Sequence, residues 1–470
     1  SLLRRNHAVD SAGGRLLDVS FNFGARVPDH EPMVAYIARG LMGGYQSGFT
    51  SGSYYLQDQV YVRTEFRDVW EYELALTPAE KQRLAAHLWE LSGQSFTYYF
   101  LTENCAYRLT ELVTLATGLP YTPPARVWFT PVELFHGLVA DQGRTPPLVK
   151  QVRFVPSSQR LLYTQFERLD GREAALANQL IADGPGTLDT TLAALTPTRK
   201  LEVIDTLLAY YEYRLAAVAE NAAPADVRAN KDTVLRARFA LPPRALPPPL
   251  PEPLPAPTTG ARGMLVGAGV IRDGEHTATQ LRFAPFLQDL IGRHRAGFVE
   301  LAVLDAEARL QGSHLVLDRL DAVRMRKLAT APDIVGEGQW SWQARAGVRR
   351  ERLVPRAGAQ DDLHAEGSVG LGRALAVGSS ALAYASADVV VEGSASPLRG
   401  GPSLGLATRG EGLRARAELR GEYDLRRERW QPRAEAELGW PLLRDLELRA
   451  GLRYDDGDTA LSAALYSTWW

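Results

Sequence analysis

The residue with the clearest chemical potential in this chain is Cys105, its only cysteine. The apolar residues that follow it recur at a spacing of three and four, as on one face of a helix: Leu109, Leu112 and Val113. Cys105 is therefore predicted at a helix N-terminus, where unpaired backbone N–H groups and the positive end of the helix dipole stabilise a thiolate and lower the pKa of the thiol. The same N–H groups can hold the oxyanion that forms when a thiolate attacks a carbonyl. The position predicts a thiol nucleophile.

Most free cysteines are small buried hydrophobic residues, so a nucleophile needs support beyond the residue type. The polar pair Glu103 and Asn104 directly precedes the predicted helix, and the chain has no second cysteine. A lone thiol forms no internal disulfide, so its retention in an oxidising compartment indicates chemistry. Glu103 and Asn104 either cap the helix or shape the oxyanion site, and capping is the commoner role. Tyr107 either contacts a lipid head group or packs on the preceding strand.

The rest of the composition excludes several classes of site. Eight histidines are scattered without the spacing of metal ligands, and there is no cysteine pair, so we expect no metal site and no cofactor. A net charge of −2 argues against nucleic acid as the main partner. No apolar run reaches the roughly 18–20 residues that a membrane helix needs. No signal peptide is recognised, and Ser1 looks like the start of a mature or trimmed fragment.

Two strands are predicted to open the chain, joined through residues 6–14. The second strand, 15–24, alternates between two sets of residues: Val19, Phe21 and Phe23 on one face, and Ser20, Asn22 and Gly24 on the other. The polar face is either exposed to solvent or lines a site. We therefore keep Asn22 as a candidate for the site around Cys105.

The next part of the chain mixes turns, strands and helices. Residues 39–49 are rich in Gly and Tyr, and their aromatic side chains, Tyr45 among them, pack either on a ligand or on the core. A helix is predicted from Thr77, which begins a capping box, to about Leu91. The pattern as a whole predicts a small α+β domain over residues 1–155.

Three further regions follow this domain. Residues 156–240 have a helical pattern with no obvious chemical residues and are expected to form a helical subdomain. Residues 241–260 form a stiff proline-rich linker. From residue 261 to 470 the period becomes two, as where Leu413, Ala415, Ala417 and Leu419 alternate with Arg414, Arg416, Glu418 and Arg420.

Residues 261–470 are predicted to be a transmembrane antiparallel β-barrel of about 12 strands. One face of each strand is apolar or small, the other is densely charged with both signs, and the chain ends in Trp470, which resembles an outer-membrane insertion signal. A soluble β-sandwich is the alternative, but its outer face is rarely so charged on every strand. Because Arg and Glu or Asp share the inward face, we expect a lumen cross-linked by ion pairs, plugged or narrow rather than open.

Several motifs stand in order in the first 110 residues: Phe21-Asn22-Phe23-Gly24-Ala25, Tyr36-Ile37-Ala38-Arg39-Gly40-Leu41-Met42-Gly43-Gly44-Tyr45, Asp68-Val69-Trp70-Glu71-Tyr72, Trp89-Glu90-Leu91, Tyr98-Tyr99-Phe100 and Glu103-Asn104-Cys105-Ala106-Tyr107-Arg108-Leu109. Together they resemble the Lnb N-terminal periplasmic domain family, which is named for a bacterial lipoprotein N-acyltransferase. The resemblance covers roughly residues 1–150. The predicted barrel looks like the C-terminal region of longer members.

This resemblance implies a permuted papain/NlpC-type fold in which the histidine base precedes the cysteine in the chain. In the family that histidine lies in a Phe-Gly-His motif, which here would fall directly before Ser1. His7, beside the predicted hairpin turn, is the nearest histidine that can substitute, although a surface turn is its more usual place. Asn22 is the candidate for the third residue, which holds the imidazole in the required tautomer.

Three functions are consistent with these features. The first is a thiol acyltransferase or lipase at the bacterial outer membrane, with its N-terminal domain in the periplasm, acting on membrane phospholipid or on lipoproteins. Cys105 would attack an ester carbonyl, form a thioester, and pass the acyl group to an amine or to water. The second is a cysteine peptidase or amidase acting on cell-wall peptides. The third is a non-enzymatic barrel with a periplasmic binding module.

Overall fold

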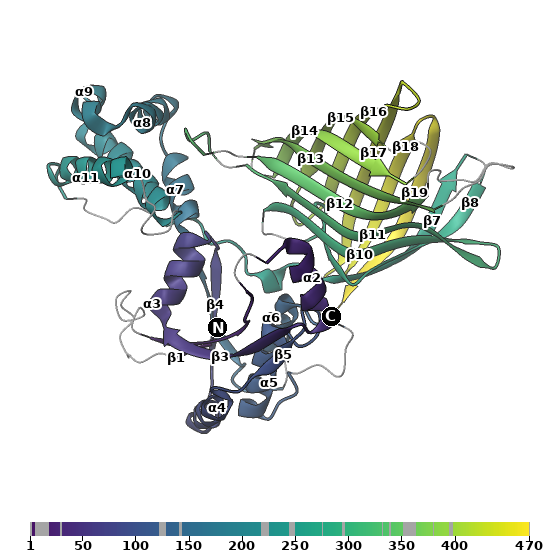
Figure 1. Ribbon diagram of the computed structural model, residues 1–470, viewed down its shortest axis with the longest axis horizontal. Helices are drawn as coiled ribbons and strands as arrows, with labels where there is room; N and C mark the ends of the chain where they lie inside the picture. The colour runs from purple at the N-terminus through teal and green to yellow at the C-terminus, as the bar shows by residue number, and fades with distance from the viewer. Residues whose placement is uncertain are drawn as a thin grey trace. The chain divides into compact units, whose positions relative to one another are not determined.

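The computed structural model describes residues 2–4, 18–28, 31–121, 128–140, 143–217, 225–243, 250–274, 276–293, 297–330, 332–337, 340–350, 363–378, 380–393 and 398–469. The chain divides into two compact units (Figure 1). The first comprises residues 1–256 and 331–337, and the second comprises residues 257–330 and 338–470. Within the described part of the chain, no helix is both long enough and apolar enough to cross a membrane.

A four-stranded antiparallel sheet in the order β1–β2–β3–β5 organises the first part of unit one. Its strands are β1 (Leu2–Arg4), β2 (Val19–Ala25), β3 (Tyr45–Ser53) and β5 (Phe96–Tyr98). Phe23 of β2 pairs with Phe49 of β3, and both side chains are buried on the same face of the sheet. The alternation predicted for the second strand therefore holds over the residues described.

Two helices pack on this phenylalanine face of the sheet. They are α4 (Pro78–Leu91) and α5 (Cys105–Thr117). Leu88 of α4 and Leu112 of α5 are buried in one cluster with Phe23 and Phe49. The helix start predicted at Cys105 is confirmed.

The remaining elements of this region are α2 (Met33–Met42), α3 (Tyr54–Gln57), η1 (Asp58–Thr64), β4 (Val69–Leu74), α6 (Pro131–Val139) and β6 (Val149–Val155). Strands β4 and β6 pair in a second, antiparallel sheet. Helix α2 ends at Gly43, whose φ of 75° lies in the left-handed region. A Cβ atom there would also lie 2.5 Å from the ring of Tyr99, so the turn that brings α2 against the end of β5 requires glycine.

The capping box predicted at the start of α4 is confirmed, and it gives unit one an acid-sensitive contact. Glu80 accepts the Thr77 amide at 2.7 Å and two guanidinium N–H groups of Arg144 at 2.6 and 2.8 Å. The hydrogen bonds from Arg144 lower the pKa of Glu80 from 4.5 to about 2. Since the pKa is lower in the folded state, this contact stabilises the fold above about pH 4.5, and the stabilisation is lost as the pH falls towards about 2.

We therefore expect Glu80→Gln to remove part of the acid dependence of folding. Between about pH 5 and about pH 3, the unfolding temperature of the variant should fall less than that of the parent chain. Circular dichroism on the full chain measures both profiles, and Arg144→Gln, which removes the partner, should flatten the profile in the same way. Two parallel profiles for Glu80→Gln and the parent chain would contradict the assignment.

A helical region completes unit one, as the sequence predicts. Its elements are α7 (Ser158–Phe166), α8 (Gly171–Asp183), η2 (Pro185–Thr187), α9 (Leu188–Thr191), α10 (Pro197–Ala216) and α11 (Ala225–Phe239). The core of these helices also contains Ile334, which is only 2% exposed. Nearby, the Val335 amide donates to Asn178 at 2.9 Å, and the Tyr213 hydroxyl donates to Glu337 at 2.8 Å. Residues 331–337 are thus part of the helical core, although they follow far later in the chain.

Unit two is a closed antiparallel β-barrel (Figure 1). After the short η3 (Pro257–Thr259) its strands are β7 (Met264–Asp273), β8 (His276–Ala284), β9 (Phe286–Gln288), β10 (Phe298–Gln311), β11 (His314–Leu328), β12 (Ser341–Arg350), β13 (Leu363–Val377), β14 (Ala381–Glu392), β15 (Leu398–Thr408), β16 (Arg414–Asp424), β17 (Arg429–Leu443), β18 (Leu446–Asp455) and β19 (Asp458–Trp469). Strands β8 and β9 both pair with β10 and flank Pro285, so they form one interrupted strand. Because β19 pairs with β7, twelve strands close the barrel, and the predicted number is confirmed.

The two faces of the barrel wall differ as the alternation predicts. On β16, Leu419 is 61% exposed on the outside, whereas Arg414 and Glu418 are buried inside. Ion pairs link the inward side chains from strand to strand, such as Arg326 with Glu418 at 2.6 Å. An apolar outer wall around a charged interior is the pattern of a membrane-spanning barrel. The expected lumen cross-linked by ion pairs is therefore present.

Candidate functional site

Cys105 is the first residue of α5 and lies on the phenylalanine face of the sheet. It is half-buried, and it packs against the cluster that contains Phe23 and Phe49. The hydroxyl of Tyr98, on β5, is hydrogen-bonded to the thiol, and burial together with this contact raises the pKa of Tyr98. The Tyr98 hydroxyl is thus a hydrogen-bonding neighbour of the sulfur. The sulfur is therefore neither sealed in the core nor without a polar neighbour.

Asn104 is the N-cap of α5 and makes contacts with both ends of its amide. Its Oδ1 accepts the N–H groups of Ala106 and Tyr107, each at 3.1 Å. Its Nδ2 donates to the carbonyls of Phe100 at 3.2 Å and Phe129 at 2.5 Å. The side chain is buried and uses both its acceptor and its donor group within the protein. Asn104 thus holds the Cys105 turn in place, which is the capping role rather than contact with a substrate.

The cap also decides which backbone N–H groups can stabilise an oxyanion. Of the first three amides of α5, those of Ala106 and Tyr107 are bound by Asn104. The amide of Cys105 is hydrogen-bonded to the side-chain oxygen of Tyr98. The sequence predicts an oxyanion site made by several helix N–H groups, whereas the first three amides of α5 already have acceptors within the protein.

Glu103 and Tyr107 take part in contacts on either side of the helix start. Glu103 forms an ion pair with Arg108, and Arg108 also binds Glu111 at 2.8 Å. The guanidinium of Arg108 stacks over the ring of Phe96, with its carbon 5.1 Å from the ring centre. Tyr107 makes an edge-to-face contact with Phe129, with ring centres 5.9 Å apart, and burial raises the pKa of its hydroxyl. Both predicted binding residues thus have partners within the protein.

Tyr45 is brought close to the site but is not open to a ligand. Its side chain is 3% exposed, and its ring lies 6.4 Å from that of Phe100. Its hydroxyl donates to Glu31, and burial with this hydrogen bond raises the pKa of Tyr45 to about 12. Of the two roles that the sequence left open for this tyrosine, core packing is the one observed.

Asn22 is not brought to Cys105. It pairs with Thr50 on β3 and, by the alternation of β2, projects from the face opposite to Phe21 and Phe23. Since Cys105 packs on the phenylalanine face, the sheet separates the two side chains. The sequence-based choice of Asn22 as the orienting residue is corrected by this geometry. The alternation was predicted properly, but the sequence did not say which face α5 would cover.

The histidines give no base for Cys105 among the described residues. His7 lies outside the residues that the structure describes, so its predicted role stays a prediction. His87 pairs with Glu90 on α4, and His136 is buried on α6. Neither has a hydrogen bond or ion pair to Cys105. Over the same described ranges, no group of three or more His, Cys, Asp or Glu residues is arranged to hold a metal ion.

Two features near Cys105 are not indicated by any pattern in the sequence. In the sequence, Tyr98 is simply an alternate residue of the strand that begins at Phe96. Only the fold shows that its hydroxyl contacts the thiol of Cys105. The end of α2 also meets the loop before α5, since the Phe100 amide donates to the Gly40 carbonyl at 2.9 Å. Next to the two residues of this hydrogen bond lie three exposed apolar residues, which we call the apolar rim: Leu41 at 47%, Met42 at 82% and Leu101 at 42% exposed.

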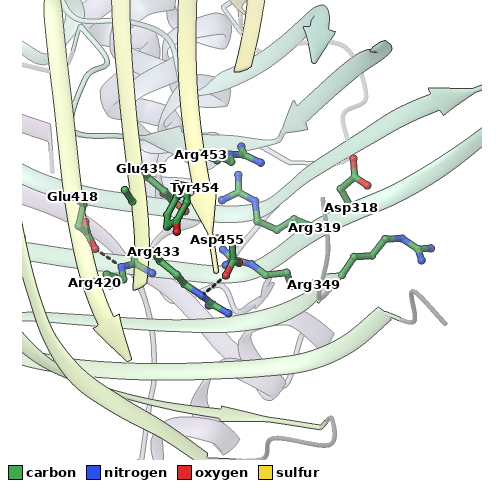
Figure 2. A pocket seen from close by; sticks show the side chains of 12 residues that line it. Asp318, Arg319, Arg349, Glu418, Arg420, Arg433, Glu435, Arg453, Tyr454 and Asp455 are labelled. Carbon is green, nitrogen blue, oxygen red and sulfur yellow. Dashed lines mark hydrogen bonds and ion pairs between the residues drawn. The ribbon is translucent and has the colours of Figure 1, made fainter. Parts of the chain in front are cut away.

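The barrel lumen contains a second candidate site. A cavity of about 60 Å³ lies among charged side chains of β11, β12, β16, β17 and β18 (Figure 2). In Figure 2 Arg433 is bonded to Asp455, at 3.0 Å, and Arg420 to Glu418, at 2.5 Å.

Comparison with known proteins gives two family matches. Residues 1–133 match the Lnb N-terminal periplasmic domain, and residues 255–469 match a domain of unknown function (DUF7840). Among curated proteins, none matches this chain. Solved structures similar to it include the KdgM porin in complex with disordered oligogalacturonate (8% identity, 44% of this chain and 99% of that chain, TM-score 0.28), the NanC porin (9%, 44% and 100%, 0.28) and the Acinetobacter baumannii outer membrane protein Omp33 (8%, 44% and 99%, 0.25).

Proposed function

Residues 1–133 belong to the Lnb N-terminal periplasmic domain family, and the same chain forms an outer-membrane β-barrel; from this premise we propose that the periplasmic domain is a cysteine-dependent acyltransferase or lipase. Cys105 is its nucleophile, and its substrates are acyl esters of phospholipid or lipoprotein. The observation that carries this proposal is the half-buried thiol at the first residue of α5, in contact with the Tyr98 hydroxyl.

The reaction proposed for Cys105 has two steps. The thiolate attacks the carbonyl carbon of an acyl ester, and the C–O bond breaks as the alcohol leaves with a proton from the base. The product of this step is a thioester on Cys105. An amine or a water molecule then attacks the thioester, gives its proton to the base, and releases the thiol. The Tyr98 hydroxyl is the local hydrogen-bonding group beside the reacting sulfur.

The strand register supports the place of the base that the family resemblance implies. Leu2 pairs with Phe21, so continuing the antiparallel register would set the position directly before Ser1 opposite Phe23. That is the face on which Cys105 packs. A histidine in this position is part of the proposal, together with the permuted papain-like fold.

The surroundings of the thiol favour a lipid over a peptide substrate. Phe23 and Phe49 pack beside Cys105, but both are buried and offer no surface to a substrate. Exposed apolar surface comes from the apolar rim, with Leu41 and Met42 at the end of α2 and Leu101 in the loop before α5. Acyl chains gain from contact with such surface, whereas cell-wall peptides carry many polar groups.

The test uses the full-length protein in detergent micelles with a phospholipid that carries an isotopically labelled acyl chain. We expect a labelled thioester on the protein, found by mass spectrometry and released by hydroxylamine. Cys105→Ala should abolish it. Tyr98→Phe should lower the rate of thioester formation about tenfold, because the sulfur loses its hydrogen-bonding neighbour. Tyr55→Phe, which removes an exposed hydroxyl elsewhere, is the matched control. Equal labelling of Cys105→Ala would refute the proposal.

A further inference from the structure

Charged side chains of both signs lie at different depths inside the barrel. The carboxylates of Asp305, Glu307 and Asp321 are buried against the wall, with side chains 0%, 2% and 0% exposed. Closer to open space, Arg349 and Arg453 are 21% and 30% exposed, and Glu435 and Asp455 are 30% and 28% exposed. Open space in the lumen is therefore bordered by guanidinium groups and carboxylates together.

The cavity of about 60 Å³ has a surplus of positive charge. Its lining contains four carboxylates, Asp318, Glu418, Glu435 and Asp455, and six arginines, Arg319, Arg349, Arg350, Arg420, Arg433 and Arg453. The difference leaves two positive charges around a space of small volume.

The carboxylates in this lining are already paired with arginines. Each has a guanidinium partner within 3.4 Å: Asp318 with Arg309, Glu418 with Arg420, Glu435 with Arg416, and Asp455 with Arg433. Two of these partners, Arg309 and Arg416, come from outside the cavity lining. Carboxylates outside the lining in turn pair with lining arginines: Glu307 with Arg319 and Arg453, and Glu422 with Arg433. The positive surplus of the lining is therefore partly compensated from outside it.

Arg349 is the arginine with the weakest internal pairing. Its one ion pair among the described residues is with Glu366, and the two atoms are 3.9 Å apart. Figure 2 shows its guanidinium without a bond to the other residues drawn. Arg319, on the neighbouring strand, has a buried Nε that finds no hydrogen-bond partner in the described part of the chain. The lining thus holds donors that an added acceptor would satisfy.

We propose that this lumen cavity is a binding site for a phosphate-type oxyanion, with Arg349 as its principal ligand. Guanidinium groups bind such anions through paired N–H donors, and the strength of these bonds is greatest where little water competes. A second cavity of about 40 Å³ shares Arg319, Glu435 and Arg453 with the first. The site therefore continues along the lumen rather than ending at the first cavity. This inference is independent of the chemistry proposed for Cys105.

The experiment is a calorimetric titration of the full chain in detergent with inorganic phosphate, in a phosphate-free buffer of low ionic strength. We expect saturable binding that weakens as salt is added. Arg349→Gln should weaken it about tenfold or more, since one charge-assisted ligand is lost. Glu435→Gln should strengthen it, because a competing carboxylate charge is removed. Arg373→Gln is the matched control, since this arginine is exposed and lies over the ring of Trp340.

The folded state of each variant is checked by its heat-dependent mobility on gels, which reports the closed barrel. No saturable binding to the parent chain would overturn the proposal, as would equal binding by a folded Arg349→Gln. Glycerol phosphate, the head-group fragment of a phospholipid, is titrated in parallel. Equal affinity for the two ligands identifies a site for free oxyanions, and a clear preference for glycerol phosphate identifies a site for lipid head groups.

Discussion

Asp305→Ala is expected to destabilise the barrel by about 3–5 kcal/mol, because it removes one partner from a group of buried ion pairs. Asp305 has a fully buried side chain on β10. It accepts two hydrogen bonds from Arg282, both at 2.9 Å, and one from Arg324 at 2.9 Å, and Arg319 lies 3.5 Å away. Without this carboxylate, Arg282 would keep only Glu307, at 3.7 Å, as an ion-pair partner among the described residues. Arg319 and Arg324 would keep other carboxylates but lose one of theirs.

The measurement is urea-dependent unfolding of the full chain in detergent or lipid vesicles, followed by gel mobility and by tryptophan fluorescence. Asp305→Asn keeps the shape of the side chain and should lose much of the same stability, because the charge rather than the volume is at stake. Glu411→Gln, at an exposed position of the β15–β16 turn, should change stability little. A loss below about 1 kcal/mol for Asp305→Ala would contradict the assignment.

Asn104→Ala is expected to cost unit one about 2–4 kcal/mol and to impair every reaction of the Cys105 thiol. The change removes the cap for the amides of Ala106 and Tyr107. It also leaves the carbonyls of Phe100 and Phe129 without their donor, and the site is buried, so water replaces that donor poorly. Thermal unfolding followed by circular dichroism, together with the rate of thiol alkylation, measures the two effects.

Two further variants separate the roles of Asn104. Asn104→Asp keeps the acceptor that caps α5 but loses the donor to both carbonyls, so it isolates the second contribution. Thr196→Ala removes an N-cap of α10 that accepts from one amide, that of Arg199 at 3.4 Å, and should cost about 1 kcal/mol or less. If Asn104→Ala lowered the free energy of unfolding no more than Thr196→Ala does, Asn104 would act only as an N-cap and would not position the thiol.

The sequence predicts well those elements whose signals are local. The start of α5 at Cys105 follows from the three-and-four spacing after it, and the start of α4 follows from Thr77 and Glu80. The twelve-stranded barrel follows from an alternation that repeats along some 200 residues. Each of these signals lies within a few residues of the structure that it specifies, so no distant partner has to be known.

The contacts that define the site depend on distant partners and were not predictable. The Tyr45 hydroxyl donates a hydrogen bond to Glu31, 14 positions away, and no pattern in the Gly- and Tyr-rich residues 39–49 indicates that partner. The sequence predicts correctly that Asn22 lies on the face of β2 opposite to Phe21 and Phe23. It does not predict that α5, with Cys105, packs on the phenylalanine face. In the barrel, Arg326 and Glu418 are 92 positions apart, and only strand order brings them together.

The position of Ile334 has a consequence for biosynthesis. The helices α7 to α11 are synthesised well before this residue, yet their core includes it, because the chain passes from unit one to unit two, returns for residues 331–337, and leaves again. The core of these helices therefore stays incomplete until the segment between β11 and β12 has been synthesised. Folding of the periplasmic unit is in this way coupled to synthesis of the barrel. A chain arrested before this segment would keep an incompletely packed helical bundle, which is more open to proteolysis.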